Sequence, residues 1–347
     1  MFVGTKTTIY RGQSATLDLS RDLADMSKNT KLLKITDPVL CRFDSAGRLG
    51  GKFTMTRLAV QELGGLIAKN LGSAWVDLAD KVSRPEEIAM VAESMNNLSS
   101  LRFAGIMGWR WVLDTADNTV AGIVGSRYKV TRNLDFWTRI EQTCLGEADK
   151  PKLFTAILHG RNLDIVMAGR DTVDICGTVF SRGVLAQNAE TSGRAVRASN
   201  VLISQADMSW ACDNFYPDTR IPHLKGRKFD ERLSQIYGRL RQRRLKKDDL
   251  QAAWTKAANT RLTKDGVDVK TSIGNISTVL RRYGLSMADS KEAAMDLVSR
   301  YKTPRMSDLL QVLGKRASGR NDGNAIKCRQ LVYSLCFIGS KNGSGKD

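Results

Sequence analysis

The strongest chemical signal in the sequence is a run of cations between positions 225 and 247. This run holds ten lysines and arginines against two acids, Asp230 and Glu231, so its net charge is +8. Cations clustered along one element suit a row of phosphates, because each neutralised phosphate releases condensed counterions. The basic residues of the run are Lys225, Arg227, Lys228, Arg232, Arg239, Arg241, Arg243, Arg244, Lys246 and Lys247.

Apolar residues recur within this run at steps of three or four positions. The spacing of Leu233, Ile236 and Leu240, with Phe229 and Tyr237, predicts an amphipathic helix over 228–246. Such a helix buries one stripe and presents its arginines on the remaining surface. The alternative is a solvated helix whose charges pair with acids elsewhere in the fold.

Two shorter basic groups lie at the ends of predicted strands. Arg127, Lys129 and Arg132 flank Tyr128 just after a strand predicted over 120–124. Here the cations would hold a phosphate backbone while the tyrosine ring stacks on a base, or the tyrosine packs in the core. Further along, Arg194 and Arg197 lie three positions apart, which places them on opposite faces of a strand, so one of them is expected to face solvent or ligand.

Signals for catalysis are few. The two histidines, His159 and His223, have no Cys or acid at metal-ligand spacing, and Asp164, Asp171 and Asp174 form no diagnostic nuclease motif. Cys212 near His223 suggests a thiol nucleophile, but the Trp-Ala-Cys context favours packing. We therefore predict no catalytic residue, no metal and no cofactor.

The overall composition indicates a folded protein with a polyanionic partner. The 347 residues carry 54 Lys and Arg against 36 Asp and Glu, a net charge of +18. No apolar stretch approaches the roughly 20 residues that span a bilayer, and the amino terminus lacks a secretory signal. We expect a cytoplasmic protein without membrane contact, with its six separated cysteines as buried reduced thiols.

The order of predicted elements is that of an α+β protein. Helices are predicted over 54–71, 83–97 and 133–144, and strands over 101–105, 109–113, 120–124, 153–158, 163–168, 177–185 and 195–203. The first three strands predict an antiparallel meander packed with helices, and the chain beyond residue 228 is mostly helical in pattern. We divide it into an extension (1–52), an α+β core (53–224), a basic helical domain (225–339) and a disordered tail (340–347).

Several motifs resemble the phage/plasmid-like protein family called domain of unknown function 932. The Gly-x-x-Tyr element at 125–128 is followed by Asn133 and a helix, and 187–193 looks like that family's Asn-Ser-Glu-x-Gly turn. Segment 212–214 resembles its Cys-x-Asn element, and His223 stands where a late histidine is often found. Ala189 replaces the usual serine, and Phe215 replaces the usual glycine.

This resemblance implies a phage or plasmid origin and an intracellular role, without an established activity. A more distant similarity is to single-strand annealing recombinases, which combine an antiparallel meander with a crossing helix and assemble into rings or filaments. Our leading hypothesis is therefore a homo-oligomeric protein that binds single-stranded DNA and promotes annealing and recombination without ATP. The alternatives are a phage factor that binds a host protein, and a metal-dependent nuclease or other DNA-acting enzyme.

Overall fold

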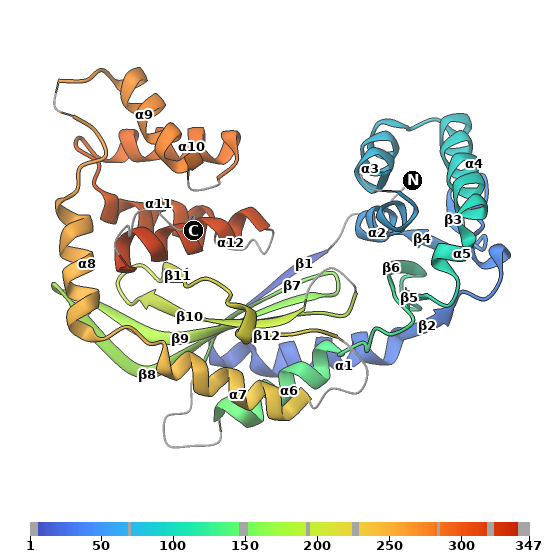
Figure 1. Ribbon diagram of the computed structural model, residues 1–347, viewed down its shortest axis with the longest axis horizontal. Helices are drawn as coiled ribbons and strands as arrows, with labels where there is room; N and C mark the ends of the chain where they lie inside the picture. The colour runs from blue at the N-terminus through green and yellow to red at the C-terminus, as the bar shows by residue number, and fades with distance from the viewer. Residues whose placement is uncertain are drawn as a thin grey trace, which may run out of the picture.

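The computed structural model describes residues 6–68, 71–145, 152–191, 195–223, 229–264, 266–282, 285–317 and 323–338. Two β-sheets and a set of helices make up this described chain, which confirms the α+β class (Figure 1). The region after residue 228 is helical, as expected. The predicted tail, 340–347, lies outside the described residues.

The larger sheet is antiparallel and has seven strands, of which four are the central strands predicted from the sequence. Its hydrogen-bonded order is β1 (Thr7–Arg11), β7 (Lys152–His159), β8 (Asn162–Ile175), β9 (Thr178–Ala189), β10 (Val196–Ser204) and β11 (Trp210–Cys212), with β12 (Arg220–Ile221) also beside β10. A two-residue turn, Gly160-Arg161, joins β7 to β8. Gly160 has φ 56°, a value that glycine adopts without steric cost.

The smaller sheet contains five strands near the amino terminus. Its order is β2 (Thr30–Lys34), β5 (Arg110–Asp114), β6 (Thr119–Val124), β4 (Phe53–Met55) and β3 (Arg48–Leu49), and only the β4–β6 pair is parallel. The expected strand at 101–105 is wrong, because α5 (Phe103–Ile106) forms there instead. Phe103 and Ile106 lie three positions apart and both pack into the core of this lobe, which a helical turn allows.

Three helices cover one face of the smaller sheet and complete what we call the small lobe. They are α2 (Arg57–Ile67), α3 (Leu71–Lys81) and α4 (Pro85–Leu101). The helix expected over 54–71 starts later, because Thr56 caps α2 by accepting a hydrogen bond from the Ala59 N–H at 3.2 Å. At the other end, α2 stops at Ile67, before the predicted end at 71, and Leu71 already belongs to α3. Trp111, fully buried, anchors the sheet beneath these helices.

One face of the larger sheet is covered by α1 (Thr16–Asn29), α6 (Asn133–Leu145) and α7 (Phe229–Gln242). A single apolar cluster joins the three helices to the alternate residues of the strands. Helix α1 contacts β1, α6 contacts β9, and α7 contacts β10 and β12, so the helices follow the order of the strands across the sheet. Figure 1 shows these helices below the sheet.

The opposite face carries the carboxyl-terminal helices. They are α8 (Lys247–Asn259), α9 (Val269–Arg282), α10 (Met287–Arg300), α11 (Leu309–Arg316) and α12 (Gly323–Tyr333), followed by a π-helical turn (Ser334–Ile338). Phe180 of β9 packs edge-on against Trp254 and Phe337, which stack on each other at 5.4 Å between ring centroids. The region predicted as a basic helical domain (225–339) therefore shares one apolar core with the larger sheet.

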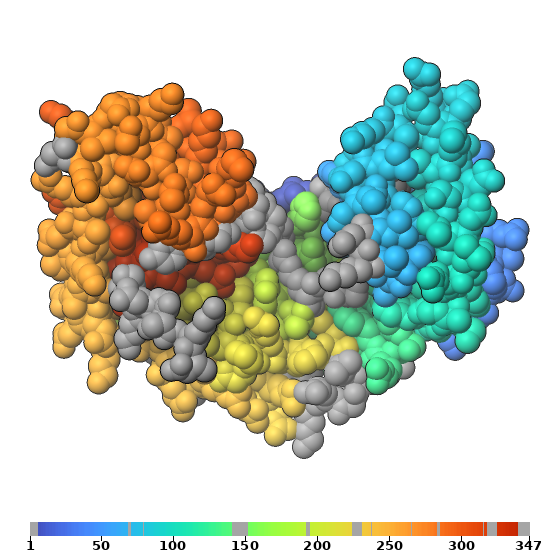
Figure 2. Space-filling model, turned by 45° about the horizontal axis from the view of Figure 1, so that its top comes forward, coloured from blue at the N-terminus to red at the C-terminus, as the bar shows by residue number. Residues whose placement is uncertain are grey.

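The short 3₁₀ helices are Gln13–Ala15, Pro38–Cys41, Pro217–Thr219 and Met306–Asp308. Figure 2 shows a hollow between the small lobe, in blue and cyan, and the orange carboxyl-terminal helices. Among the described residues, no helix combines the length and apolar character needed to span a bilayer.

The cysteines follow the expectation of buried thiols with one exception. Cys41, Cys212, Cys328 and Cys336 are buried, whereas Cys176 is exposed. The prediction is wrong for Cys176 because this residue, with φ 53°, stands in the tight turn between β8 and β9, where a side chain projects into solvent. The side chain of Cys144 lies outside the described residues.

Candidate nucleic-acid interface

The basic segment after β6 lies alongside the chain that follows β12. Gly125 accepts a hydrogen bond from the Tyr128 N–H at 3.0 Å, and the Lys129 N–H donates to the carbonyl oxygen of His223 at 3.0 Å. Arg110 of β5 fixes the turn by donating from Nη2 to the carbonyl oxygens of Gly125 and Tyr128. The side chains of Arg127, Lys129 and Arg132 are exposed, so all three predicted cations reach solvent from an anchored loop.

Tyr128 has the contacts of a packed side chain. Its ring stacks on His223 with 4.8 Å between centroids and 29° between planes. Its hydroxyl donates to the carbonyl oxygens of Ala189 and Thr191, at 3.1 and 2.6 Å. Burial raises the pKa of Tyr128 well above that of a free phenol. Of the two roles left open by the sequence, these contacts favour packing over base stacking.

Arg132 and Arg197 are also tied into the fold. Arg132 Nη1 donates to Ser27 Oγ at 2.9 Å, which links this segment to α1. Arg197 Nε donates to Gln187 Oε1 at 2.6 Å, and its guanidinium lies 4.1 Å from the ring centre of Phe215. Arg194 lies outside the described residues.

Arg220 is a cation that the sequence analysis missed. Strand β12 pairs with β10 so that Arg220 stands opposite Arg197. The Arg220 side chain is exposed, and its Nη2 donates to the carbonyl oxygen of Phe215 at 3.1 Å. No local signal marks this residue, because it is the one lysine or arginine between positions 198 and 224, and only strand pairing brings it beside Arg197.

The predicted basic helix forms as α7, and the side chains of Leu233, Ile236 and Leu240 are buried beneath the sheet as expected. The helix ends at Gln242, however, so the expected continuation to 246 is wrong. Lys246 is the N-cap residue of the next helix, α8, and the first turn of α8 carries Asp248 and Asp249. Acids at that position stabilise a new helix start, so the chain begins a second helix here.

Part of this run is paired with acids. Arg243 forms two hydrogen bonds with the Asp218 carboxylate, both at 2.9 Å, and its guanidinium lies 4.2 Å from the ring centre of Tyr216. Arg239 donates to the Asp218 carbonyl oxygen at 2.8 Å. The hydrogen bond from Arg243 lowers the pKa of the Asp218 carboxyl. Arg239 and Arg243 thus share the single negative charge of Asp218, so the group of three keeps a net positive charge.

The other cations of the run differ in their surroundings. Arg244 Nη1 lies 3.8 Å from Asp171 Oδ2. Within the described residues, no ion pair involves Arg232, Arg241, Lys246 or Lys247, and all but Arg232 are exposed. Lys225, Arg227 and Lys228 lie outside the described residues. Both interpretations of the basic run are therefore represented in the fold, with some arginines paired and others solvated.

These contacts bring two distant basic segments close together on the surface at the β12 edge of the larger sheet. Lys129 is anchored at His223, while Arg239 and Arg243 are anchored at Asp218. The two anchors are five positions apart in the chain, so they lie at most about 18 Å apart even in a fully extended chain. We call this surface the basic ridge. It consists of Arg127, Lys129, Arg220, Arg239 and Arg243.

A buried polar network lies behind the ridge. Glu190 accepts from the Asn133 N–H at 2.7 Å and from Arg161 Nη1 at 3.1 Å. Asn133 in turn donates to the Arg161 carbonyl oxygen at 3.1 Å and accepts from Asn188 Nδ2 at 2.7 Å. The residues of the predicted Gly-x-x-Tyr, Asn and Asn-x-Glu motifs thus converge in space, and their polar groups position the segment that carries Arg127 and Lys129.

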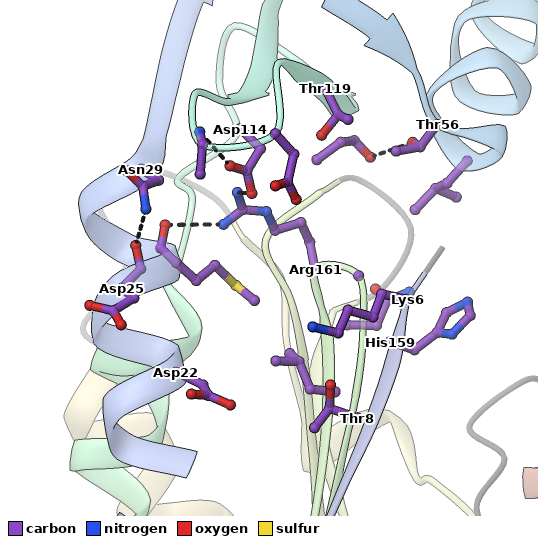
Figure 3. Close-up of a pocket in the computed structure, with 18 of the residues that line it drawn as sticks. Lys6, Thr8, Asp22, Asp25, Asn29, Thr56, Asp114, Thr119, His159 and Arg161 are labelled. Carbon is purple, nitrogen blue, oxygen red and sulfur yellow. Dashed lines mark hydrogen bonds and ion pairs between the residues drawn. The ribbon is translucent and has the colours of Figure 1, made fainter. Parts of the chain in front are cut away.

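An acidic cavity lies on another part of the molecule. Its volume is about 650 Å³, and it opens between α1, the β5–β6 turn, the start of α2 and the β7–β8 turn. Figure 3 shows Asp22 and Asp25 of α1 and Asp114 of β5 around it, with Lys6 and Arg161 on the opposing side. With Asp117 and Arg57 included, the lining holds four carboxylates against three cations, so it offers a polyanion no net attraction and the basic ridge is the better nucleic-acid surface.

Three of the candidate catalytic groups are buried or held in local contacts. Cys212 is completely buried, and burial raises its pKa to about 12, so the thiolate nucleophile is disfavoured. Asp171 pairs with Arg182 at 3.1 Å, and Asp174 accepts from the Gly177 N–H at 2.8 Å. Within the part of the chain that the structure describes, no group of three or more His, Cys, Asp or Glu side chains could hold a metal ion.

No protein-family model matches the chain, and neither the curated proteins nor the solved structures contain a match to it.

Proposed function

We propose that the protein binds single-stranded DNA along the basic ridge and promotes strand annealing without ATP, as an intracellular factor of phage type. The observation that carries this proposal is the convergence of two basic segments, over 100 positions apart, at the chain between Asp218 and His223. The net charge of +18 supports the same partner class.

The ridge offers both kinds of contact that a single strand requires. Its cations would bind successive phosphates, and release of counterions would supply most of the free energy of binding. The Arg243 guanidinium, stacked on Tyr216, offers a flat surface on which an unpaired base can stack. A single strand exposes such bases, whereas a duplex hides them, so the proposal includes a preference for the single strand.

Fluorescence anisotropy with a labelled single strand and the matching duplex, titrated at several salt concentrations, tests this proposal. The wild-type protein should bind the single strand more tightly, with affinity falling steeply as salt rises. Replacing Arg127 and Lys129 by glutamate should weaken binding and reduce the salt slope by about two. Replacing Lys31 and Lys34, both exposed on β2, changes net charge equally and should leave binding almost unaffected.

Annealing is tested separately with complementary labelled strands, in EDTA and without ATP. Protein should accelerate duplex formation, and the Arg127→Glu/Lys129→Glu variant should lose that acceleration. Equal loss of affinity in the β2 control would contradict the ridge and indicate general charge attraction. Degradation of the strands when magnesium is added would instead support a nuclease, and salt-stable capture of a protein without DNA retention would support the host-factor alternative.

A further inference from the structure

Among the described strands, β1 is an edge of the seven-stranded sheet with β7 as its one neighbour. Figure 1 shows it on the far side of the sheet from β11 and β12. Beyond its ends, the Gly160 N–H donates to the Lys6 carbonyl oxygen and the Gly12 N–H donates to the Phe154 carbonyl oxygen, both at 3.0 Å. In an antiparallel pair such bonds alternate along the strand, so the even-numbered residues of β1 bond to β7.

The odd-numbered residues therefore direct their backbone groups away from the sheet. Within the described chain, no hydrogen bond reaches the backbone N–H or C=O of Thr7, Ile9 or Arg11. Ile9 is also 39% exposed, which is high for an isoleucine. An edge with unpaired backbone groups and an exposed apolar residue is a template for another strand.

Cavities flank this edge on both faces of the sheet. The acidic cavity is lined by the even-numbered residues Thr8 and Tyr10. On the other face, Ile9 and Arg11 line a second cavity of about 660 Å³, whose rim includes Met208, 59% exposed. An added strand would thus have room for its side chains on both faces.

We propose that β1 pairs with β1 of a second copy of this chain, antiparallel and about a two-fold axis at Ile9. In this register Ile9 faces Ile9 of the second copy, and Thr7 faces its Arg11. All three residues with outward backbone groups are then used, giving about six hydrogen bonds across the interface. The result is one continuous sheet that runs through both copies.

The side chains of β1 are self-complementary in this register. On one face the apolar Ile9 pair lies at the axis, between two Thr7–Arg11 pairs. On the other face Thr8 lies opposite Tyr10 of the second copy, and Lys6 lies opposite Gly12. No like charges stand directly opposite each other, an arrangement that would destabilise a sheet. A parallel pairing in register would instead bring the two Arg11 residues side by side.

The proposed contact is isologous, so it closes at two copies and by itself builds neither a ring nor a filament. It leaves the basic ridge free in each copy, because the ridge lies at the β12 edge of the sheet. The inference does not depend on the proposed nucleic-acid binding, and its tests contain no nucleic acid.

Light scattering coupled to size exclusion should give twice the chain mass of 38.4 kDa at micromolar concentration. Ile9→Pro removes only an outward N–H and should halve the measured mass while retaining the circular dichroism of the folded protein. The matched variant Thr8→Pro removes an N–H that bonds to β7 and should lower thermal stability instead. A wild-type monomer, or a folded Ile9→Pro dimer, would overturn the proposal.

Cross-linking tests the register even if Ile9→Pro fails to fold. In a Cys176→Ser background, Ile9→Cys places two thiols on Cα atoms about 5.5 Å apart, within disulfide range, so mild oxidation should yield a covalent dimer. Arg11→Cys in the same background places the thiols about 14 Å apart and should remain monomeric in a denaturing gel. Cross-linking by Arg11→Cys but not Ile9→Cys would exclude this register.

Discussion

Arg161 Nη2 lies 2.6 Å from Asp114 Oδ2, and this ion pair joins the turn between β7 and β8 to the end of β5 in the small lobe. The same guanidinium lies 3.1 Å from the buried Glu190 and donates to Thr30 Oγ1 at 2.6 Å. The Arg161 side chain is 3% exposed. One arginine therefore connects both sheets, because its planar fork can serve two carboxylates at once.

We expect Arg161→Met to lower the free energy of unfolding by about 3–5 kcal/mol, because Glu190 would remain as a buried charge without its main partner. Arg161→Lys should recover only part of this loss, since a point charge does not reproduce the fork. Urea denaturation provides the measurement. As a control, Arg48→Ala removes an exposed pair with Asp44 and should cost at most about 1 kcal/mol.

Tyr128→Phe separates the two roles considered for that ring. Because its hydroxyl donates to the carbonyl oxygens of Ala189 and Thr191, the variant should lose about 1 kcal/mol of stability. A ring that stacks on bases in solvent would tolerate this change without loss. Equal midpoints of urea unfolding for the variant and the wild type would therefore contradict the packed role.

The sequence was informative wherever one local pattern determines the outcome. The apolar stripe of α7 and the cores of β8 and β9 agree with the predictions, although β8 continues to Ile175 and β9 to Ala189, beyond the predicted ends at 168 and 185. The glycine of the turn at Gly160-Arg161 is a local signal of the same kind. Short elements were less certain, as 101–105 shows, since four apolar residues fit a strand or a single helical turn equally well.

The parts that the sequence did not predict are contacts between distant segments. The sequence around Arg220 does not mark it as a neighbour of Arg197. Likewise, the sequence around Asp218 does not indicate that Arg239 of α7 and Arg243, just after α7, bind there. Arg161 lies in a turn, but its partners Asp114 and Glu190 come from separate elements. Such ion pairs depend on the folded topology, whereas residue periodicity reports only the local environment.

Asp213 should make stability depend on pH. Burial raises the pKa of its carboxyl, which accepts hydrogen bonds from the Asn214 N–H and the Tyr216 hydroxyl. Above the unfolded value of 3.8, the folded state therefore holds a proton that the unfolded state has released. The contribution of Asp213 to stability falls as pH rises through this window and stays low above the folded pKa.

Asp213→Asn removes this titration while keeping an acceptor oxygen in place. The variant should show a flatter dependence of unfolding free energy on pH than the wild type, from about pH 4 upward, and should gain stability relative to it as pH rises. Urea unfolding at a series of pH values measures both slopes. Parallel curves for the two proteins would show that Asp213 titrates normally in the folded state.

Two adjacent glycines of α2 should respond oppositely to alanine. A Cβ on Gly64 would lie 2.5 Å from the Gly72 Cα of α3, so the two helices touch through their backbones. Gly64→Ala should therefore cost about 1–3 kcal/mol as the helices are forced apart. A Cβ on Gly65 meets nothing within 4 Å, and Gly65→Ala should gain about 0.5–1 kcal/mol by restricting the unfolded chain. Thermal unfolding of both variants measures the difference, and a similar shift in both would contradict the close contact between α2 and α3.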